Sequence, residues 1–153
     1  MHSSFDDLIT GLCALTDYPA PLKIIAGEGI EFEGVNFAII CKQKSDPDAL
    51  FLYADFGWLD LEQQAMLYPL MLKENFMMLG SRECTFGVSK LLDSVVLIEK
   101  VRLSQTSPES LLILMRSLAR RANYFCKHHR AGASLTKRPA PRVRSAARLN
   151  ITA

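Results

Sequence analysis

The chain has 153 residues, enough for one domain with its own hydrophobic core and a short tail. Its hydrophobic fraction is 49% and its mean hydropathy is +0.10, so a partner is expected to cover some of its apolar surface. No apolar run reaches the length of a membrane span, and the N-terminus carries Asp6 and Asp7 where a signal peptide needs positive charge. We therefore expect a cytoplasmic protein.

The charge is divided between two parts of the chain. Residues 1–126 carry all 16 acidic residues against 11 Lys and Arg, a net charge of −5, whereas residues 127–153 carry seven basic residues and no acidic one. The overall charge of +2 therefore hides an acidic body and a basic tail. We predict a domain over residues 1–128 and a disordered tail over 129–153, because the tail has no hydrophobic periodicity.

The first predicted element is a helix that Ser4 caps, with Asp7 at the third helical position of a capping box. Its apolar residues recur at helical spacing and form one stripe: Phe5, Leu8, Ile9, Leu12 and Leu15. Pro19 and Pro21 end it, because proline supplies no backbone donor. The segment LKII at 22–25 is interpreted as an additional short strand.

Three strands are predicted next, over residues 30–33, 36–41 and 50–58. Gly34 gives the first two a tight connection, and Pro47 stops pairing in the polar turn before the third. The run from Phe37 to Cys41 is apolar throughout, which predicts that both faces of this strand are covered.

A second helix is predicted from Asp60, with Gln63 at its capping-box position. Pro69 falls inside it, so we expect a kink or a shortened helix. Two further strands follow over 83–88 and 94–103. A third helix begins with Ser107 as its cap and Pro108 at its first position.

The predicted fold class is α+β, in the order helix, three strands, helix, two strands, helix. Strand runs that are joined by short hairpins and separated by single helices indicate a twisted antiparallel sheet with helices packed on it.

No catalytic or metal-binding constellation is found in the sequence. The three histidines, His2, His128 and His129, lie at the edges of the predicted fold, where no rigid scaffold fixes a catalytic group. The four cysteines are widely spaced, form no C-x-x-C pair, and are interpreted as reduced core thiols. The glycines of GEGIEFEG precede a strand, not the helix of a dinucleotide site. We therefore predict no enzyme, no cofactor and no metal.

Taken together, the local motifs resemble the CesT/Tir-chaperone family of type III secretion chaperones over roughly residues 4–128. The resemblance is carried by six segments, which are FDDLITGLCAL, IEFEGVNFAIIC, LFLYADFG, LYPLMLKENFMM, CTFGVSKLLDSVVLIEKVRL and TSPESLLILMRSLARRANYF. It implies a bacterial, cytoplasmic homodimer that binds the N-terminal chaperone-binding segment of a secreted effector and keeps it soluble and competent for export.

The resemblance also suggests where the two partners bind. In the family the second helix and the last strand pair contribute to the dimer, and the resemblance places dimer contacts on this chain at Leu67, Leu70, Met71 and Phe76. Filling of the monomer core is the alternative for these four. An effector segment adds a strand at the edge of the first strand and fills apolar pockets. The candidates for that surface, which are equally plausible as core residues, are Ile30, Phe32, Phe37 and Phe56.

Two departures from the family pattern keep other functions open. Members are usually acidic overall, whereas this chain ends in a basic tail, and Pro69 is unexpected in the second helix. A nucleic-acid-associated regulator acting through the tail is the main alternative, although the tail lacks the aromatic residues that stack on bases. A small enzyme or a carrier of an apolar ligand is the third. Whether the tail contacts the client, the secretion-system ATPase or nothing stays open.

Overall fold

The computed structural model describes residues 4–41, 46–78, 84–90 and 93–129. Four α-helices and five strands follow one another along this part of the chain. In chain order they are α1 (Phe5–Thr16), α2 (Pro21–Ile25), β1 (Ile30–Phe32), β2 (Val35–Cys41), β3 (Ala49–Trp58), α3 (Leu61–Met78), β4 (Cys84–Val88), β5 (Ser94–Arg102) and α4 (Pro108–His129), with a 3₁₀ turn at Leu103–Gln105. The predicted α+β class and element order are confirmed. The predicted tail lies outside the described residues.

The five strands form one antiparallel sheet in the order β1-β2-β3-β5-β4. One row of paired residues crosses the whole sheet on its buried face, namely Ile30, Phe37, Ala54, Leu97 and Phe86. The outer strands are therefore β1 and β4, at opposite edges.

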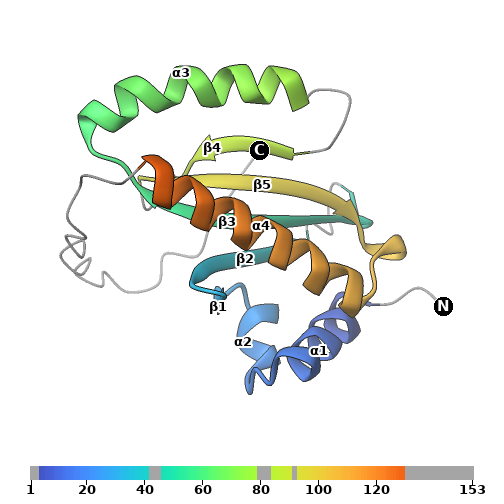
Figure 1. Cartoon of the computed structure of the whole chain (residues 1–153). Coiled ribbons are helices and arrows are strands. Elements are labelled where there is room, and N and C mark those ends of the chain that lie inside the picture. Colours follow the sequence, from blue (N-terminus) through green and yellow to red (C-terminus); the bar gives the residue numbers. More distant parts are fainter. Residues whose placement is uncertain (1–3, 42–45, 79–83, 91–92, 130–153) are drawn as a thin grey trace.

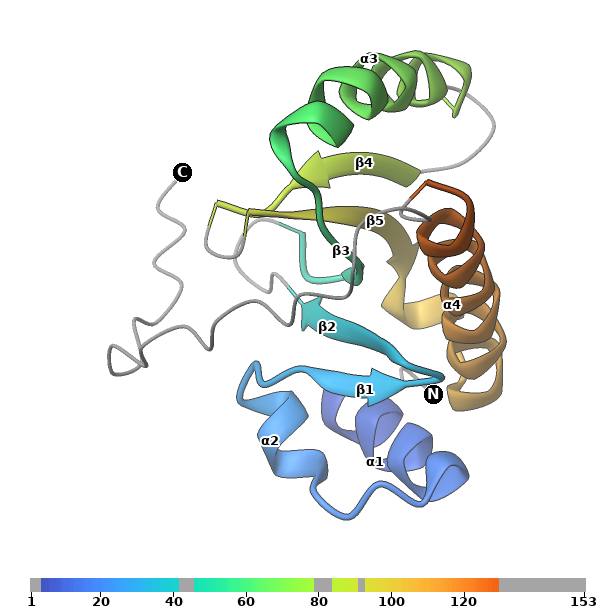
Figure 2. The same ribbon diagram turned by 60° about the vertical axis from the view of Figure 1, so that its left-hand side comes forward.

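Helices cover one face of this sheet. Figures 1 and 2 show α4 crossing that face, with α1 packed beside it and α3 lying along the β4 edge. The core forms between the inward side chains of the strands and the apolar stripes of α1 and α4, including Leu8, Leu52 and Met115. On the opposite face, Tyr53 and Ile98 form a half-buried row.

The prediction that β2 is covered on both faces is wrong. Phe37 and Ile39 are buried, whereas Ala38 and Ile40 on the other face are half-buried. No helix of the described part lies on that face, so its apolar side chains shield one another only partly.

Local signals explain where α1 and α2 begin. Asp7 donates its backbone N–H to Ser4 Oγ at 3.2 Å, and the Asp7 carboxylate accepts from the Ser4 backbone, so the predicted capping box is confirmed. The predicted strand at 22–25 is wrong, because Pro21 starts the short helix α2 there with its fixed φ. Leu15 is exposed, although its predicted stripe is otherwise buried or partly buried.

The helix α3 runs through Pro69 without interruption, so of the two predicted effects the shortened helix is wrong, and the kink stays a prediction. Both Pro69 and Ala65, whose carbonyl loses its helical donor, lie on the exposed side of the helix. The predicted start is confirmed, since Gln63 donates its backbone N–H to Asp60 Oδ1 at 2.8 Å and Asp60 donates back to Gln63 Oε1 at 3.1 Å. Within the described part, no helix combines the length and hydropathy needed to cross a bilayer.

Candidate functional site

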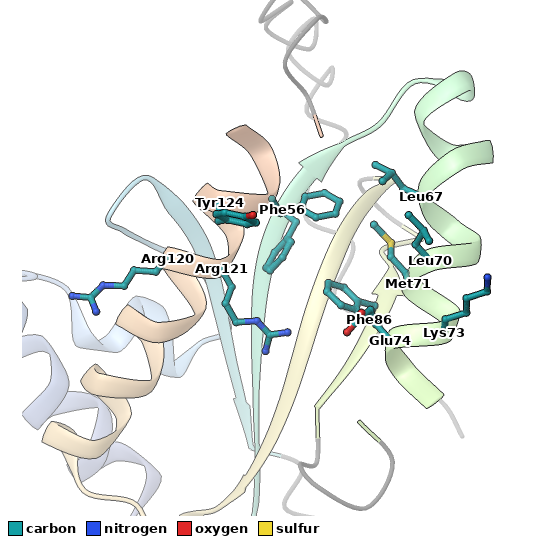
Figure 3. A pocket seen from close by; sticks show the side chains of 11 residues that line it. Phe56, Leu67, Leu70, Met71, Lys73, Glu74, Phe86, Arg120, Arg121 and Tyr124 are labelled. Carbon is teal, nitrogen blue, oxygen red and sulfur yellow. The ribbon is translucent and has the colours of Figure 1, made fainter. Parts of the chain in front are cut away.

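A groove opens between α3 and α4 above the end of the sheet (Figure 3). Its volume is about 600 Å³, and most of its lining is apolar. Side chains from two helices and two strands form it: Phe56, Leu67, Leu70, Met71, Lys73, Glu74, Phe86, Arg120, Arg121, Tyr124 and Phe125. We call this the α3–α4 groove.

Phe56 lies at the centre of the aromatic side of this groove. Its ring meets Phe86 edge-on at a centroid distance of 5.6 Å and lies 5.5 Å from Phe125 in a tilted arrangement. The pairing of β3 with β5 shifts register between Asp55 and Gly57, which leaves Phe56 as the extra residue of a bulge. Gly57 has φ +88° and donates its backbone N–H to Asp55 Oδ1 at 2.8 Å. The bulge therefore fixes the direction in which Phe56 enters the groove.

The wall formed by α3 is attached to the sheet through Asn75. Asn75 Nδ2 donates to the Phe86 carbonyl at 3.1 Å, and Asn75 Oδ1 accepts the Phe86 backbone N–H at 2.7 Å. The side-chain amide thus pairs with the outer edge of β4 as a neighbouring strand would. Leu67 and Met71 on the same helix are 2% and 7% exposed, and both face the groove.

Arg121 is the one half-buried cation among the lining residues. Its guanidinium has no ion pair or hydrogen bond with the described residues, and in Figure 3 its side chain extends from α4 along the groove side of the sheet. Arg120 and Lys73 also contribute to the lining, but both are exposed, and in Figure 3 their charged ends are directed outward from the groove. Glu74 is the only acidic residue of the lining.

The opposite edge of the sheet is held by a different set of contacts. Arg116 on α4 pairs with Glu33 in the β1–β2 turn at 3.0 Å, and Asn123 Nδ2 donates to the Glu33 carbonyl at 3.1 Å. The Arg116 guanidinium also lies 5.9 Å from the centre of the Phe32 ring. These contacts fix the hairpin on α4, while the outer edge of β1 pairs with no further strand of the described part.

The model of the Tir chaperone protein (CesT) family matches residues 20–125, more than half of the sequence. The chain belongs to this family. The resemblance predicted from the sequence is therefore confirmed, and the family supports the prediction of a chaperone without enzymatic activity. No curated protein is similar enough in sequence to count as a match.

Two solved structures share the fold of this CesT-family chain. The crystal structure of the ExsC–ExsE complex matches with a TM-score of 0.55 and 16% identity, covering 66% of this chain and 74% of the other. The crystal structure of the Yersinia pestis type III secretion chaperone SycH in complex with a stable fragment of YscM2 matches with a TM-score of 0.54 and 18% identity, covering 79% of this chain and 98% of the other.

The four residues predicted for effector binding do not form one exposed surface. Ile30 and Phe37 are paired in register on the buried face, and Phe56 lies in the groove; all three are at most 2% exposed. Phe32, under Arg116, is half-buried. Contact of these residues with an effector stays a prediction.

The residues predicted for the dimer interface divide between two faces of α3. Leu67, Leu70 and Met71 line the α3–α4 groove, whereas Phe76 lies outside it and is 74% exposed. Their dimer role stays a prediction.

The other wall of the groove was not anticipated from the sequence. Arg121 and Tyr124 on α4 line the groove beside strands that are distant in the sequence, and spacing along the chain does not encode this placement. The same holds for the hydrogen bonds of Asn75 to β4. The Asp-Phe-Gly triplet at 55–57 was the available local signal, since a glycine within a strand pattern often marks a bulge.

Proposed function

We propose that this CesT-family chain is a cytoplasmic, homodimeric type III secretion chaperone. It binds the N-terminal chaperone-binding segment of a secreted effector and keeps that protein soluble and competent for export, without a cofactor. The secretion-system ATPase is a further candidate partner, and the same binding experiments test for it.

The observation that carries the proposal is the amount of uncovered apolar surface on α3. Leu61, Leu72 and Phe76 are 82%, 68% and 74% exposed. At 100° per residue, all three lie about 150–170° from the mean direction of the α3 residues that line the groove. The helix therefore has two apolar faces, and a helix of this kind is buried on both in its working state. A second copy of the chain, packing α3 against α3, covers the outer face symmetrically.

The free edge of β1 supports the client side of the proposal. An extended segment that adds to this edge gains backbone hydrogen bonds, and alternate side chains find pockets. The α4 contacts to Glu33 keep the hairpin in place for such an addition. Of the four residues predicted from the sequence to bind the effector, Phe32 is half-buried and lies at this edge. Its exposed part is accessible to a client segment that adds to β1.

The dimer is tested by light scattering coupled to size-exclusion chromatography. The double variant Leu72→Glu, Phe76→Glu is expected to elute as a folded monomer, because each large apolar side chain contributes roughly 1.5–3 kcal/mol when buried. Leu22→Glu, which changes a residue 77% exposed on α2, is the matched control and should stay dimeric. A monomeric wild-type protein would contradict the proposal.

Client binding is tested by a tagged pull-down from the native host at moderate and high salt, read by mass spectrometry. One secreted protein, retained at high salt through its N-terminal region, is the expected result. Recovery of nucleic acid that is lost at high salt would instead favour the tail-dependent regulator.

A further inference from the structure

We propose that the α3–α4 groove binds a large apolar side chain of the client that stands next to an acidic residue, and that Arg121 recognises the carboxylate. This inference rests on the proposed function, since it assumes a polypeptide client. It adds a second contact point, distant from the β1 edge, with a stated chemical preference.

The apolar part of the preference follows from the lining of the groove. A volume of about 600 Å³ lies within the range of sites that enclose small ligands or several side chains. The buried Phe56 ring packs against both Phe86 and Phe125, and these two half-buried rings offer surface to a further apolar group. Met71 on the opposite wall is flexible enough to adapt to its shape.

The acidic part follows from the state of Arg121. A guanidinium carries five N–H donors in a planar fork that matches a carboxylate, and here it has no acceptor among the described residues. The half-burial of Arg121 lowers the local dielectric constant, so an incoming carboxylate gains more there than in open water. A basic client residue would be repelled by the same guanidinium.

Charge also decides among the possible occupants. The chain's own residues 130–153 carry six basic residues and no acidic one, so Arg121 disfavours them. A second copy that packs on Leu72 and Phe76 lies on the side of α3 opposite the mean direction of its groove-lining residues. The occupant that fits is therefore an acidic–apolar segment of another protein, the client.

The test uses two capped peptides and the full-length protein. One peptide has the core Glu-Leu-Phe-Glu-Leu, and the other has Gln in place of both Glu. Binding is followed by NMR through the Arg121 Nε–H and the Met71 methyl signals. The Glu peptide is expected to shift both signals and to bind at least about tenfold more tightly than the Gln peptide, as expected for a charge-assisted hydrogen bond.

Two substitutions that remove one positive charge from α4 provide a matched pair. Arg121→Gln should remove the preference for Glu, whereas Lys127→Gln changes an exposed cation of the same helix that does not line the groove, and should retain it. Arg121→Lys keeps the charge without the fork and should restore part of the preference. Thermal unfolding of each variant checks that the fold is unchanged.

Other outcomes would overturn the inference. Equal binding of both peptides, absence of binding, or an equal effect of Lys127→Gln and Arg121→Gln would each exclude carboxylate recognition by Arg121. Groove signals that change on protein dilution alone would assign the groove to a second copy. If the wild-type protein retains its client in the pull-down while these peptide tests fail, the proposed function stands without this inference. If the peptides bind and no client is found, the groove has the stated peptide preference, but the proposed function and the assignment of the occupant as a client both fail.

Discussion

At the scale of single residues, the contact between Gly11 and Pro108 shows how closely α1 packs on the start of α4. A Cβ placed on Gly11 would lie 2.5 Å from Pro108 Cγ and 3.1 Å from its Cβ. The pyrrolidine ring is rigid, so the two helices have to separate to admit even a methyl group.

Gly11→Ala is therefore expected to lower the free energy of unfolding by about 1–2 kcal/mol, after the gain in helix propensity of about 1 kcal/mol is counted. Chemical denaturation measures this change. In a Pro108→Ala background the same substitution should cost less, because most of the ring is gone. An equal cost in both backgrounds would show that the ring is not the cause.

Asp48 links two distant segments through its carboxylate. Oδ1 accepts the Ser104 backbone N–H at 2.7 Å, Oδ2 accepts the Ser104 hydroxyl at 2.9 Å, and Arg102 lies 3.5 Å away. These contacts, the backbone hydrogen bond first, lower the pKa of the Asp48 carboxyl below its ordinary value. They hold the start of β3 against the end of β5.

The lowered pKa of Asp48 sets the direction of a pH effect. A carboxyl with a lower pKa in the folded state stabilises that state at pH values above its unfolded pKa of about 4. This stabilisation is lost as the pH falls through the folded pKa. Asp48→Asn should therefore be less stable than wild type at pH 7, with the difference shrinking below about pH 4. Denaturation curves across this range test it, with the exposed Asp93→Asn as reference; a constant difference would contradict the argument.

At the scale of elements, Asn75 determines how α3 sits on the sheet. Its two hydrogen bonds pair the Phe86 N–H and C=O groups at the outer edge of β4. Without them, these groups would be available to pair with another strand. The same contact fixes the distance between α3 and β4 and so keeps the α3–α4 groove open at its α3 wall.

Asn75→Ala should leave the Phe86 N–H and C=O without this partner and cost about 1–3 kcal/mol. Hydrogen exchange at the Phe86 amide is expected to become faster, together with that of the α3 amides, while α1 amides change little. Asn36→Ala, at an exposed position of β2, is the control. Unchanged exchange at Phe86 would mean that the edge is protected by something else.

The elements that the sequence predicts well are those whose signals are local. The Ser4 and Asp60 capping boxes, the Pro108 start and the Gly34 turn depend on residues within a few positions of one another, and the structure has each of them. The segment at 22–25 was misassigned because four residues carry no resolvable period, and the helix start at Pro21 decided it. The groove was missed because its walls meet only after the sheet has formed.

At the scale of the whole molecule, the division of charge separates protein binding by the acidic body from phosphate binding by the basic tail. The proposed surfaces for a second copy and for a client all lie within the acidic body, in residues 4–129. Six of the seven basic residues of the C-terminal region follow His129. Removing residues 130–153 changes the net charge from +2 to −4 without touching those surfaces.

The truncated chain 1–129 is therefore expected to keep the dimer mass and the retained client of the full-length protein at both salt concentrations. Any nucleic acid that the full-length protein recovers should disappear with the tail, since phosphate contacts by Lys and Arg are steeply dependent on salt and charge. Pull-down and light scattering of the two proteins in parallel measure both effects. If the truncated protein keeps its fold and dimer but loses the client, the basic tail is part of the client site, and recognition by the body alone is refuted.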